Sequence, residues 1–257
     1  MKTLAFVAAI TAAGLFAQTP SMSCKDQNSS RPTFCEVRES TIAALPTLNV
    51  DGRQNGGISI RGANRSDILV RAMVQAQAET ESEAKTTGAQ VIVHTSAGTV
   101  QADGPSRSNW SVSYEIFVPN KTNLSLKAHN GGVSVAGVES SIEFHSINGG
   151  ISLRDVGGNV HGDTVNGGVS VVLANAHWNG QGMDVSTQNG GVSMKVPDQF
   201  SAILDVATVN GGASVKLPNV QGRGSNKLNL TLGSGGPLIK IRTHNGGVSV
   251  SGNQMKA

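Results

Sequence analysis

One short motif recurs along this chain and constrains its fold more than any other feature. Asn-Gly-Gly, followed by a small apolar residue and then Ser, occurs seven times in 257 residues. The Asn residues of the copies are Asn55, Asn130, Asn148, Asn166, Asn189, Asn210 and Asn245. From Asn130 onward the intervals are 18, 18, 23, 21 and 35 residues. Such self-similarity is typical of a solenoid, in which each repeat buries its apolar face against its neighbours.

Apolar and polar residues alternate on both sides of each Asn. The third and fifth residues after the Asn are apolar in every copy, from Ile58 and Ile60 to Val248 and Val250. The fourth and sixth residues before it are also apolar from Asn130 onward, except at Gly162. A period of two predicts a strand, a turn and a second strand in each repeat. The copy at Asn55 lacks the upstream register, so we assign it to an N-terminal unit.

The Asn-Gly-Gly turn has a structural interpretation. Glycine tolerates positive φ, so the pair can form a sharp corner after a small Ala, Ser or Thr. Strands stacked about 4.8 Å apart bring like Asn amides within hydrogen-bonding distance of one another. We therefore predict a turn ladder formed by Asn130, Asn148, Asn166, Asn189, Asn210 and Asn245 with Gly131, Gly149, Gly167, Gly190, Gly211 and Gly246.

The Ser of each copy lies between two inward apolar residues and is expected to face outward. The resulting column consists of Ser134, Ser152, Ser170, Ser193, Ser214 and Ser249, with Ser59 as a seventh counterpart. Two interpretations stay open: a polar strip that binds a glycan or another protein, or a compact residue that tolerates close stacking. Trp178, in the segment AHWNGQG, is the candidate aromatic for stacking on a sugar, with local packing as the alternative.

Catalytic and metal-binding motifs are missing from the sequence. It contains no G-x-S-x-G, HExxH, CxxC or P-loop pattern. The six His residues take different offsets from the Asn, apart from His129 and His244, and so predict no ligand column. We expect no catalytic residues, metal or cofactor. A polysaccharide-active solenoid enzyme remains the alternative, indicated only by Asp205, Lys240 and Arg242.

The N-terminus predicts export. Lys2 precedes an apolar run of 14 residues from position 4 to 17, which is typical of a signal peptide and shorter than the roughly 20 residues that span a bilayer. Cys24 and Cys35 favour a disulfide in an exported chain, with lipidation of Cys24 as the alternative. The formal charge of +3 is spread along the chain without a basic block, so nucleic acid is not an expected partner.

The region before the dense repeats reads as ordinary β-structure with one helix. Residues 67–78 alternate as a half-buried strand, and residues 79–89 are rich in helix formers and end near Gly88. Further strands are expected within residues 90–104 and 109–119, the last ending at Pro119.

Several segments together resemble a known family. The NGG-(V/I)-S-V units, FCEVRES (34–40), GGISIRG (56–62) and WSVSYEIFVP (110–119) are similar to a bacterial family of putative adhesins, a domain of unknown function. The resemblance spans roughly residues 34–252. It implies a right-handed β-solenoid in an envelope or secreted protein, and it brings no catalytic or binding residues with it.

These observations predict an all-β chain: a right-handed parallel β-solenoid with an N-terminal β-rich cap containing one short helix. The expected divisions are a signal peptide (1–20), a disulfide-bonded segment (21–47), the cap (48–120) and the solenoid (121–257). The predicted function is that of a non-enzymatic, adhesin-like binding or scaffold module outside the cytoplasm, contacting a glycan or cell-surface protein. A purely structural envelope component is a further alternative. Strand 246–250 is expected to end the stack and offer an edge for self-association.

Overall fold

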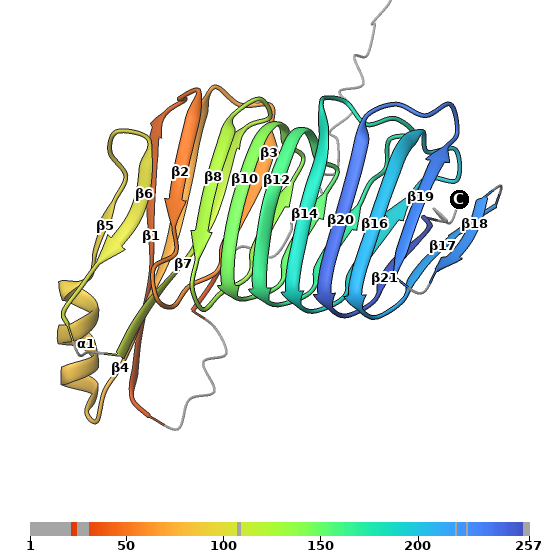
Figure 1. Cartoon of the computed structure of the whole chain (residues 1–257). Helices are drawn as coiled ribbons and strands as arrows, with labels where there is room; N and C mark the ends of the chain where they lie inside the picture. Colours follow the sequence, from red (N-terminus) through yellow and green to blue (C-terminus); the bar gives the residue numbers. More distant parts are fainter. Residues whose placement is uncertain (1–21, 25–30, 107–108, 219, 225, 254–257) are drawn as a thin grey trace, which may run out of the picture.

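The computed structural model describes residues 22–24, 31–106, 109–218, 220–224 and 226–253. Two large β-sheets of mostly parallel strands lie face to face, and one helix lies at the N-terminal end of the stack (Figure 1). The predicted all-β class, with a single short helix, is confirmed. The predicted signal peptide lies outside the described residues.

Sheet A contains eleven strands. In spatial order they are β1 (Thr33–Ala43), β4 (Asp67–Gln77), β7 (Asn109–Pro119), β3 (Ile58–Ala63), β9 (Val133–Ala136), β11 (Ile151–Arg154), β13 (Val169–Val172), β15 (Val192–Val196), β21 (Val248–Gly252), β17 (Ala213–Leu217) and β18 (Val220–Gly224).

Sheet B contains ten strands. From the same end of the molecule they are β5 (Ile92–His94), β6 (Thr99–Asp103), β2 (Thr47–Asp51), β8 (Asn123–Ala128), β10 (Glu139–Asn148), β12 (Gly157–Asn166), β14 (Gly182–Asn189), β20 (Leu238–Asn245), β16 (Ala202–Asn210) and β19 (Lys227–Leu232).

Each repeat forms what we call a rung: a strand of sheet B, its Asn-Gly-Gly turn, and the following strand of sheet A. Neighbouring rungs pair in parallel and in register, so that Ile142 lies opposite Val160 and Ile151 opposite Val169. The inward positions predicted from the alternation are buried in every rung. The core is therefore a stack of aliphatic layers between the two sheets, stabilised chiefly by removal of their apolar surface from water.

Gly162 interrupts the apolar pattern because its neighbour in the stack is large. A Cβ at Gly162 would lie 2.4 Å from the carbonyl oxygen of Phe144 and 2.5 Å from Cδ2 of its ring, which is fully buried in the adjacent strand β10. The glycine leaves space for the buried Phe144 ring opposite it, so the two residues together fill one layer.

The rungs are not stacked in sequence order at the C-terminal end. β20 lies between β14 and β16 in sheet B, and β21 lies between β15 and β17 in sheet A. The prediction that strand 246–250 ends the stack is therefore wrong. The end is formed by β18 and β19, which pair antiparallel with β17 and β16 and lie within the long interval between Asn210 and Asn245.

The assignment of Asn55 to a separate unit is also wrong. β2 pairs in parallel with β8, placing Leu48 opposite Leu124 and Val50 opposite Leu126, and β3 pairs in parallel with β9. Four residues lie between Val50 and Asn55, against three between Leu126 and Asn130. One extra residue before the turn, and not a different architecture, shifts this copy out of the sequence register.

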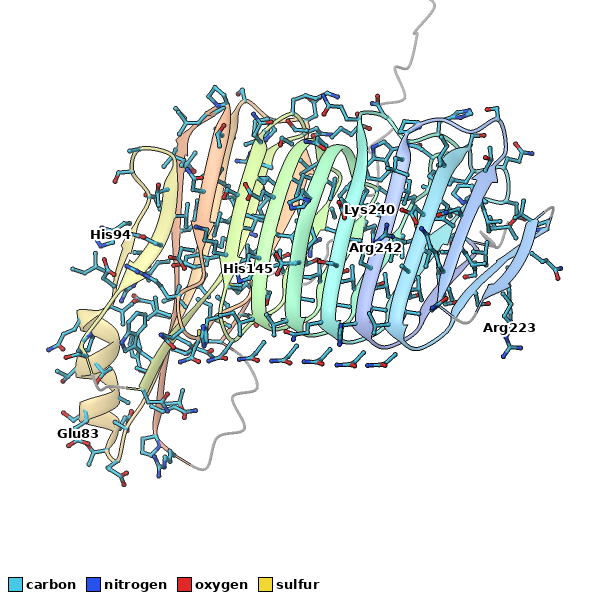
Figure 2. All side chains as sticks on the ribbon, in the orientation of Figure 1. Glu83, His94, His145, Arg223, Lys240 and Arg242 are labelled. Carbon is cyan, nitrogen blue, oxygen red and sulfur yellow. A yellow bond between two sulfur atoms is a disulfide. The ribbon has the colours of Figure 1, made fainter. Side chains whose placement is uncertain are left out.

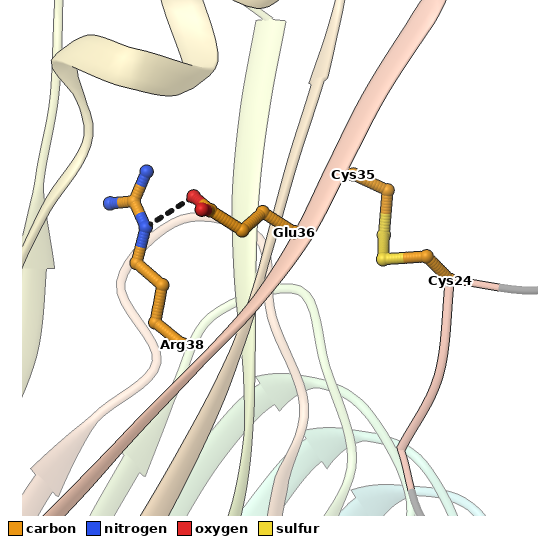
Figure 3. The surroundings of a disulfide bond; sticks show 4 residues. All are labelled: Cys24, Cys35, Glu36 and Arg38. Carbon is orange, nitrogen blue, oxygen red and sulfur yellow. Dashed lines mark hydrogen bonds and ion pairs between the residues drawn. A yellow bond between two sulfur atoms is a disulfide. The ribbon is translucent and has the colours of Figure 1, made fainter.

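The N-terminal end of the stack carries the helix and the disulfide. β4 pairs antiparallel with β1 and β7, and α1 (Glu81–Gln90) follows β4, with Thr80 and Glu83 forming a capping box. Both elements match the predictions for residues 67–78 and 79–89. Cys24 and Cys35 form the predicted disulfide, which ties residue 24 to β1 (Figure 3). No helix among the described residues has the length and apolarity needed to cross a membrane.

Candidate functional site

The Asn side chains of all seven rungs form one hydrogen-bonded row. Each contact joins Nδ2 of one Asn to Oδ1 of the next at 2.7–3.0 Å. In spatial order the row is Asn55, Asn130, Asn148, Asn166, Asn189, Asn245 and Asn210. Every amide donates toward the Asn55 end, so the row has a direction. The row leaves the Nδ2 donor of Asn55 unused at one end and the Oδ1 acceptor of Asn210 unused at the other.

A second row of hydrogen bonds runs inside the turns. Buried Thr hydroxyls two residues before the Asn donate to the carbonyl of the first glycine in the neighbouring rung, as from Thr164 to Gly149 at 2.8 Å and from Thr187 to Gly167 at 2.7 Å. Ser146, Thr208 and Thr243 make the same contact. The sequence showed these residues only as small. Their hydroxyls donate hydrogen bonds to turn carbonyls, and a buried carbonyl without a hydrogen-bond partner would destabilise the fold.

The first glycines are needed for a reason other than the one expected. Of the twelve turn glycines from Gly131 onward, only Gly246 has φ in the left-handed range, and its value of 155° is close to extended backbone. At Gly149, however, a Cβ would lie 2.1 Å from the carbonyl oxygen of Gly131, and at Gly167 it would lie 2.2 Å from that of Gly149. Close approach between successive turns, and not positive φ, excludes a side chain here.

The Ser residues form an in-register column on the outer face of sheet A. Ser152 lies opposite Ser134 and Ser170, and Ser193 lies opposite Ser170 and Ser249. The column borders a shallow groove of about 660 Å³ whose floor includes the side-chain-free backbone of Gly150, Gly168 and Gly191. Ser152, Ser170, Ser193 and Ser249 are exposed, whereas Ser59, Ser134 and Ser214 are half-buried.

The outer face of sheet B carries paired charges. Lys240 Nζ lies 2.7 Å from Asp184 Oδ2, Arg242 forms an ion pair with Asp205, and His145 Nδ1 lies 2.9 Å from Asp163 Oδ2. Lys240, Arg242 and His145 lie on this one face (Figure 2). Asp205, Lys240 and Arg242 thus come together as the stack places β20 beside β14 and β16. No group of three or more His, Cys, Asp or Glu suited to a metal occurs in the described part of the chain.

Trp178 does not present a surface for stacking. Its side chain is 5% exposed, packs in the core cluster, and donates from Nε1 to the carbonyl of Gly158 at 3.0 Å. Its candidacy as a sugar-stacking residue is therefore wrong, and the alternative of local packing holds.

Two residues that the sequence pattern did not single out, Arg53 and Trp110, line a cavity of about 430 Å³ at the Asn55 end of the row. The only sequence signal was the irregular register before Asn55. Nearby, Tyr114 is buried and its hydroxyl has no partner among the described residues. Burial raises the pKa of Tyr114 above its usual range, with a smaller effect of the Asp51 charge, so the phenol stays neutral.

A family profile described as Toastrack DUF4097 matches residues 47–251. The chain belongs to the Toastrack DUF4097 family. The match includes β2 and the rung at Asn55 together with all later rungs. A search of curated proteins gives no match.

Solved structures with a similar arrangement share little sequence with this Toastrack chain. A putative cell adhesion protein from Clostridium sporogenes is 11% identical, with 85% of this chain and 100% of the other covered and a TM-score of 0.43. A putative adhesin from Bacteroides fragilis is 11% identical, with 86% and 97% covered and a TM-score of 0.37. A putative lipid binding protein from Parabacteroides distasonis is 11% identical, with the same coverage and a TM-score of 0.27. These names do not identify a ligand for this chain.

Proposed function

We propose that this Toastrack chain is an exported, non-enzymatic module that binds a component of the cell envelope through the outer face of sheet A. The scaffold is a parallel coil, and we take its hand to be right-handed, as parallel crossover connections almost always are. The Cys24–Cys35 disulfide supports export, because such bonds persist in oxidising compartments.

The observation that carries this proposal is the groove beside the Ser column. Ser152, Ser170 and Ser193 present hydroxyls at the strand spacing of about 4.8 Å, next to backbone that no side chain covers. The Asn and Thr hydrogen bonds fix this surface, so little ordering is needed when a partner binds. A regular, rigid row of donors and acceptors is suited to an extended polymer lying along the stack.

The charged face of sheet B gives less support to the enzymatic alternative. Asp205 is paired with Arg242, and Lys240 with Asp184, along an ordered sheet surface. General acid–base catalysis needs a titratable group directed at substrate and free to exchange its proton. The ion pairs join neighbouring rungs, so stabilisation of the stack explains them without a catalytic role.

The test compares two charge-matched variants in binding to isolated bacterial envelopes. Ser152, Ser170 and Ser193 are replaced together by Lys, and the control carries Ser125→Lys, Ser186→Lys and Gln188→Lys on sheet B. We expect the purified protein to sediment with envelopes, the sheet A variant to lose at least about tenfold in affinity, and the control to bind as the unaltered protein does. Equal binding by both variants, or no binding by the unaltered protein, would contradict the proposal.

A further inference from the structure

The turn at Asn55 is preceded by a residue in the left-handed region, and no other Asn-Gly-Gly turn in the described part of the chain has a non-glycine residue of this kind in the two residues before it. The extra residue between Val50 and Asn55 is accommodated at Arg53, which has φ of 53°. This left-handed conformation is unfavourable for a residue with a side chain, and such strain is common where a ligand site requires it. The consequence is local: the arginine side chain leaves the regular turn and reaches the strand β6.

Contacts with β6 hold the Arg53 guanidinium in place. Its Nε donates to the carbonyl of Ala102 at 3.3 Å and its Nη2 donates to Asp103 Oδ1 at 2.5 Å. The other oxygen of Asp103 lies 3.3 Å from Nε2 of His94. The arginine and the carboxylate neutralise one another, and they present a fixed planar donor group and a carboxylate at the wall of the cavity.

Trp110 supplies an aromatic surface in the same place. The half-buried indole lines the cavity of about 430 Å³ with Arg53, Gln54 and Asn55, and it also borders a second cavity of about 260 Å³ on β4 and β7. Its Nε1 donates to the carbonyl of Pro105 at 3.0 Å. Gly104 allows this placement, since a Cβ there would lie 2.7 Å from the indole Cε2. The ring is thus fixed between two open spaces.

The Asn row ends in this cavity. Asn55 Oδ1 accepts from Asn130 Nδ2 at 3.0 Å, while Asn55 Nδ2 has no protein hydrogen-bond partner in the described part of the chain. Six aligned amide contacts polarise one another, which strengthens the donor at the end of the row. The Nδ2 of Asn55, a residue that lines the cavity with Arg53 and Trp110, is therefore a donor without an acceptor among the described residues.

We propose that this cavity binds one neutral saccharide unit of a glycan. A sugar ring offers an apolar CH face to an aromatic ring and, around its rim, hydroxyls that both donate and accept. The cavity matches both requirements, with Trp110 for the face, Asn55 and Arg53 as donors, and Asp103 and Gln54 as acceptors. The Arg53–Asp103 pair leaves no net charge for an acidic sugar to neutralise, and the volume is within the range of small-ligand sites.

This inference goes beyond the proposed function, because it concerns a site separate from the Ser column and either one can fail without the other. The first experiment is an array of immobilised neutral and acidic glycans probed with the full chain and with the variants Asn55→Asp and Asn210→Asp.

The two variants add the same charge at opposite ends of the Asn row. Asn55→Asp keeps the acceptor for Asn130 and removes the donor that faces the cavity. We expect neutral glycans to bind, with a loss of about fivefold or more for Asn55→Asp only.

A second measurement locates the ligand. The chain has two tryptophans, so in a Trp178→Phe variant Trp110 is the only indole fluorophore. Titration with the soluble form of the best neutral glycan is expected to change its emission saturably, and Trp110→Ala is expected to abolish binding on the array. Four results would each overturn the inference: no binding to the array, a preference for acidic glycans, equal losses of affinity in both Asn variants, or glycan binding without a change in Trp110 emission. Envelope binding through the Ser column would survive those results. A Trp110 response without envelope binding would overturn only the proposed function.

Discussion

At the scale of single residues, the two glycines of a turn have different roles although the sequence repeats them as a pair. The first glycine packs against the backbone of the preceding turn, and the second borders the open groove of sheet A. A Cβ at Gly149 would overlap the Gly131 carbonyl, whereas a Cβ at Gly150 would be 3.4 Å from the carbonyl oxygen of Gly168, an ordinary contact. Neither position has left-handed φ.

We therefore expect Gly149→Ala and Gly150→Ala to differ sharply in stability. Gly149→Ala should lower the free energy of unfolding by about 2–3 kcal/mol, or the melting temperature by roughly 5–10 °C, because the turns must move apart. Gly150→Ala should change it by less than about 0.5 kcal/mol, since the loss of chain entropy in the unfolded state offsets a mild contact. Thermal unfolding of the two proteins side by side checks this. Similar melting temperatures would show that close approach between turns is not the constraint.

Glu139 provides a pH-dependent contact at the start of β10. Its Oε2 accepts from Lys121 Nζ at 3.0 Å and from Asn179 Nδ2 at 2.9 Å. The hydrogen bond from Lys121 has the largest effect and lowers the pKa of Glu139. Burial opposes it, and the Lys121 charge and the Asn179 hydrogen bond each lower the pKa further. The carboxylate thus stabilises the fold above its ordinary pKa, and this contribution is lost as the pH falls through the lowered one.

A Glu139→Gln variant should accordingly be less stable than the unaltered protein at neutral pH, by about 0.5 kcal/mol for an exposed pair. The difference should begin to shrink below the ordinary carboxyl pKa of 4.5 and disappear only below the lowered pKa of the folded protein, where both side chains are neutral. Chemical denaturation at neutral and at acidic pH measures both values. A difference that persists unchanged in acid would mean that the carboxylate charge contributes nothing.

At the scale of the elements, the direction of the Asn row is a property that no single rung has. Asn55 acts only as an acceptor in the row, Asn210 acts only as a donor, and the five between them do both. An aspartate can replace an acceptor but not a donor. The two ends of the row should therefore respond differently to the same substitution.

We expect Asn55→Asp to leave the stability unchanged within about 0.5 kcal/mol and Asn210→Asp to lower it by about 1 kcal/mol. In the second variant a carboxylate faces Oδ1 of Asn245, so a hydrogen bond is replaced by repulsion between two acceptors. Urea unfolding of both variants tests this. If Asn55→Asp were the more damaging change, the row would run in the opposite direction.

The local structure of a rung could be predicted from the sequence, because strand alternation is a local pattern. Every apolar residue placed inward, from Leu124 to Val250, is buried. The contacts between rungs could not be predicted in the same way. The close approach at Gly149, the Thr187 hydrogen bond and the space that Gly162 leaves for Phe144 all depend on which residue lies one layer away.

The candidate binding residues were less predictable than the fold. The Ser column followed from the alternation, since an outward position is a local property. Trp178 was misjudged because a loop residue can fold back onto the core, and here it does so through Gly158. Trp110 lies on β7 and Arg53 follows β2, so they come together only after β2 pairs with β6 and β7 pairs with β3, and no local pattern reports those pairings.

At the scale of the whole molecule, the chain departs from sequential stacking. After β15 the chain skips one position in each sheet, forms β16 to β19 at the far end, and returns to fill the vacant position with β20 and β21 (Figure 1). The rung at Asn245 is therefore an internal layer, paired on both sides, although it follows all the other described rungs in the sequence. It joins the outermost strands to the rest of the stack.

Removal of the chain after Pro237 should consequently destabilise strands beyond the deleted rung. Without β20 and β21, strands β16 and β17 retain only their antiparallel partners β19 and β18, and the inward faces of two layers lose their neighbours. We expect amides of residues 202–232 to lose hydrogen-exchange protection in this variant, while those of β8 to β13 keep theirs, because stability in a stack comes mainly from adjacent layers. A control ending after Asn253 retains all the strands that the structure describes and should exchange as the full chain does. Continued protection of β16 and β17 in the shorter variant would mean that they had moved directly against β14 and β15, as in a stack that follows sequence order.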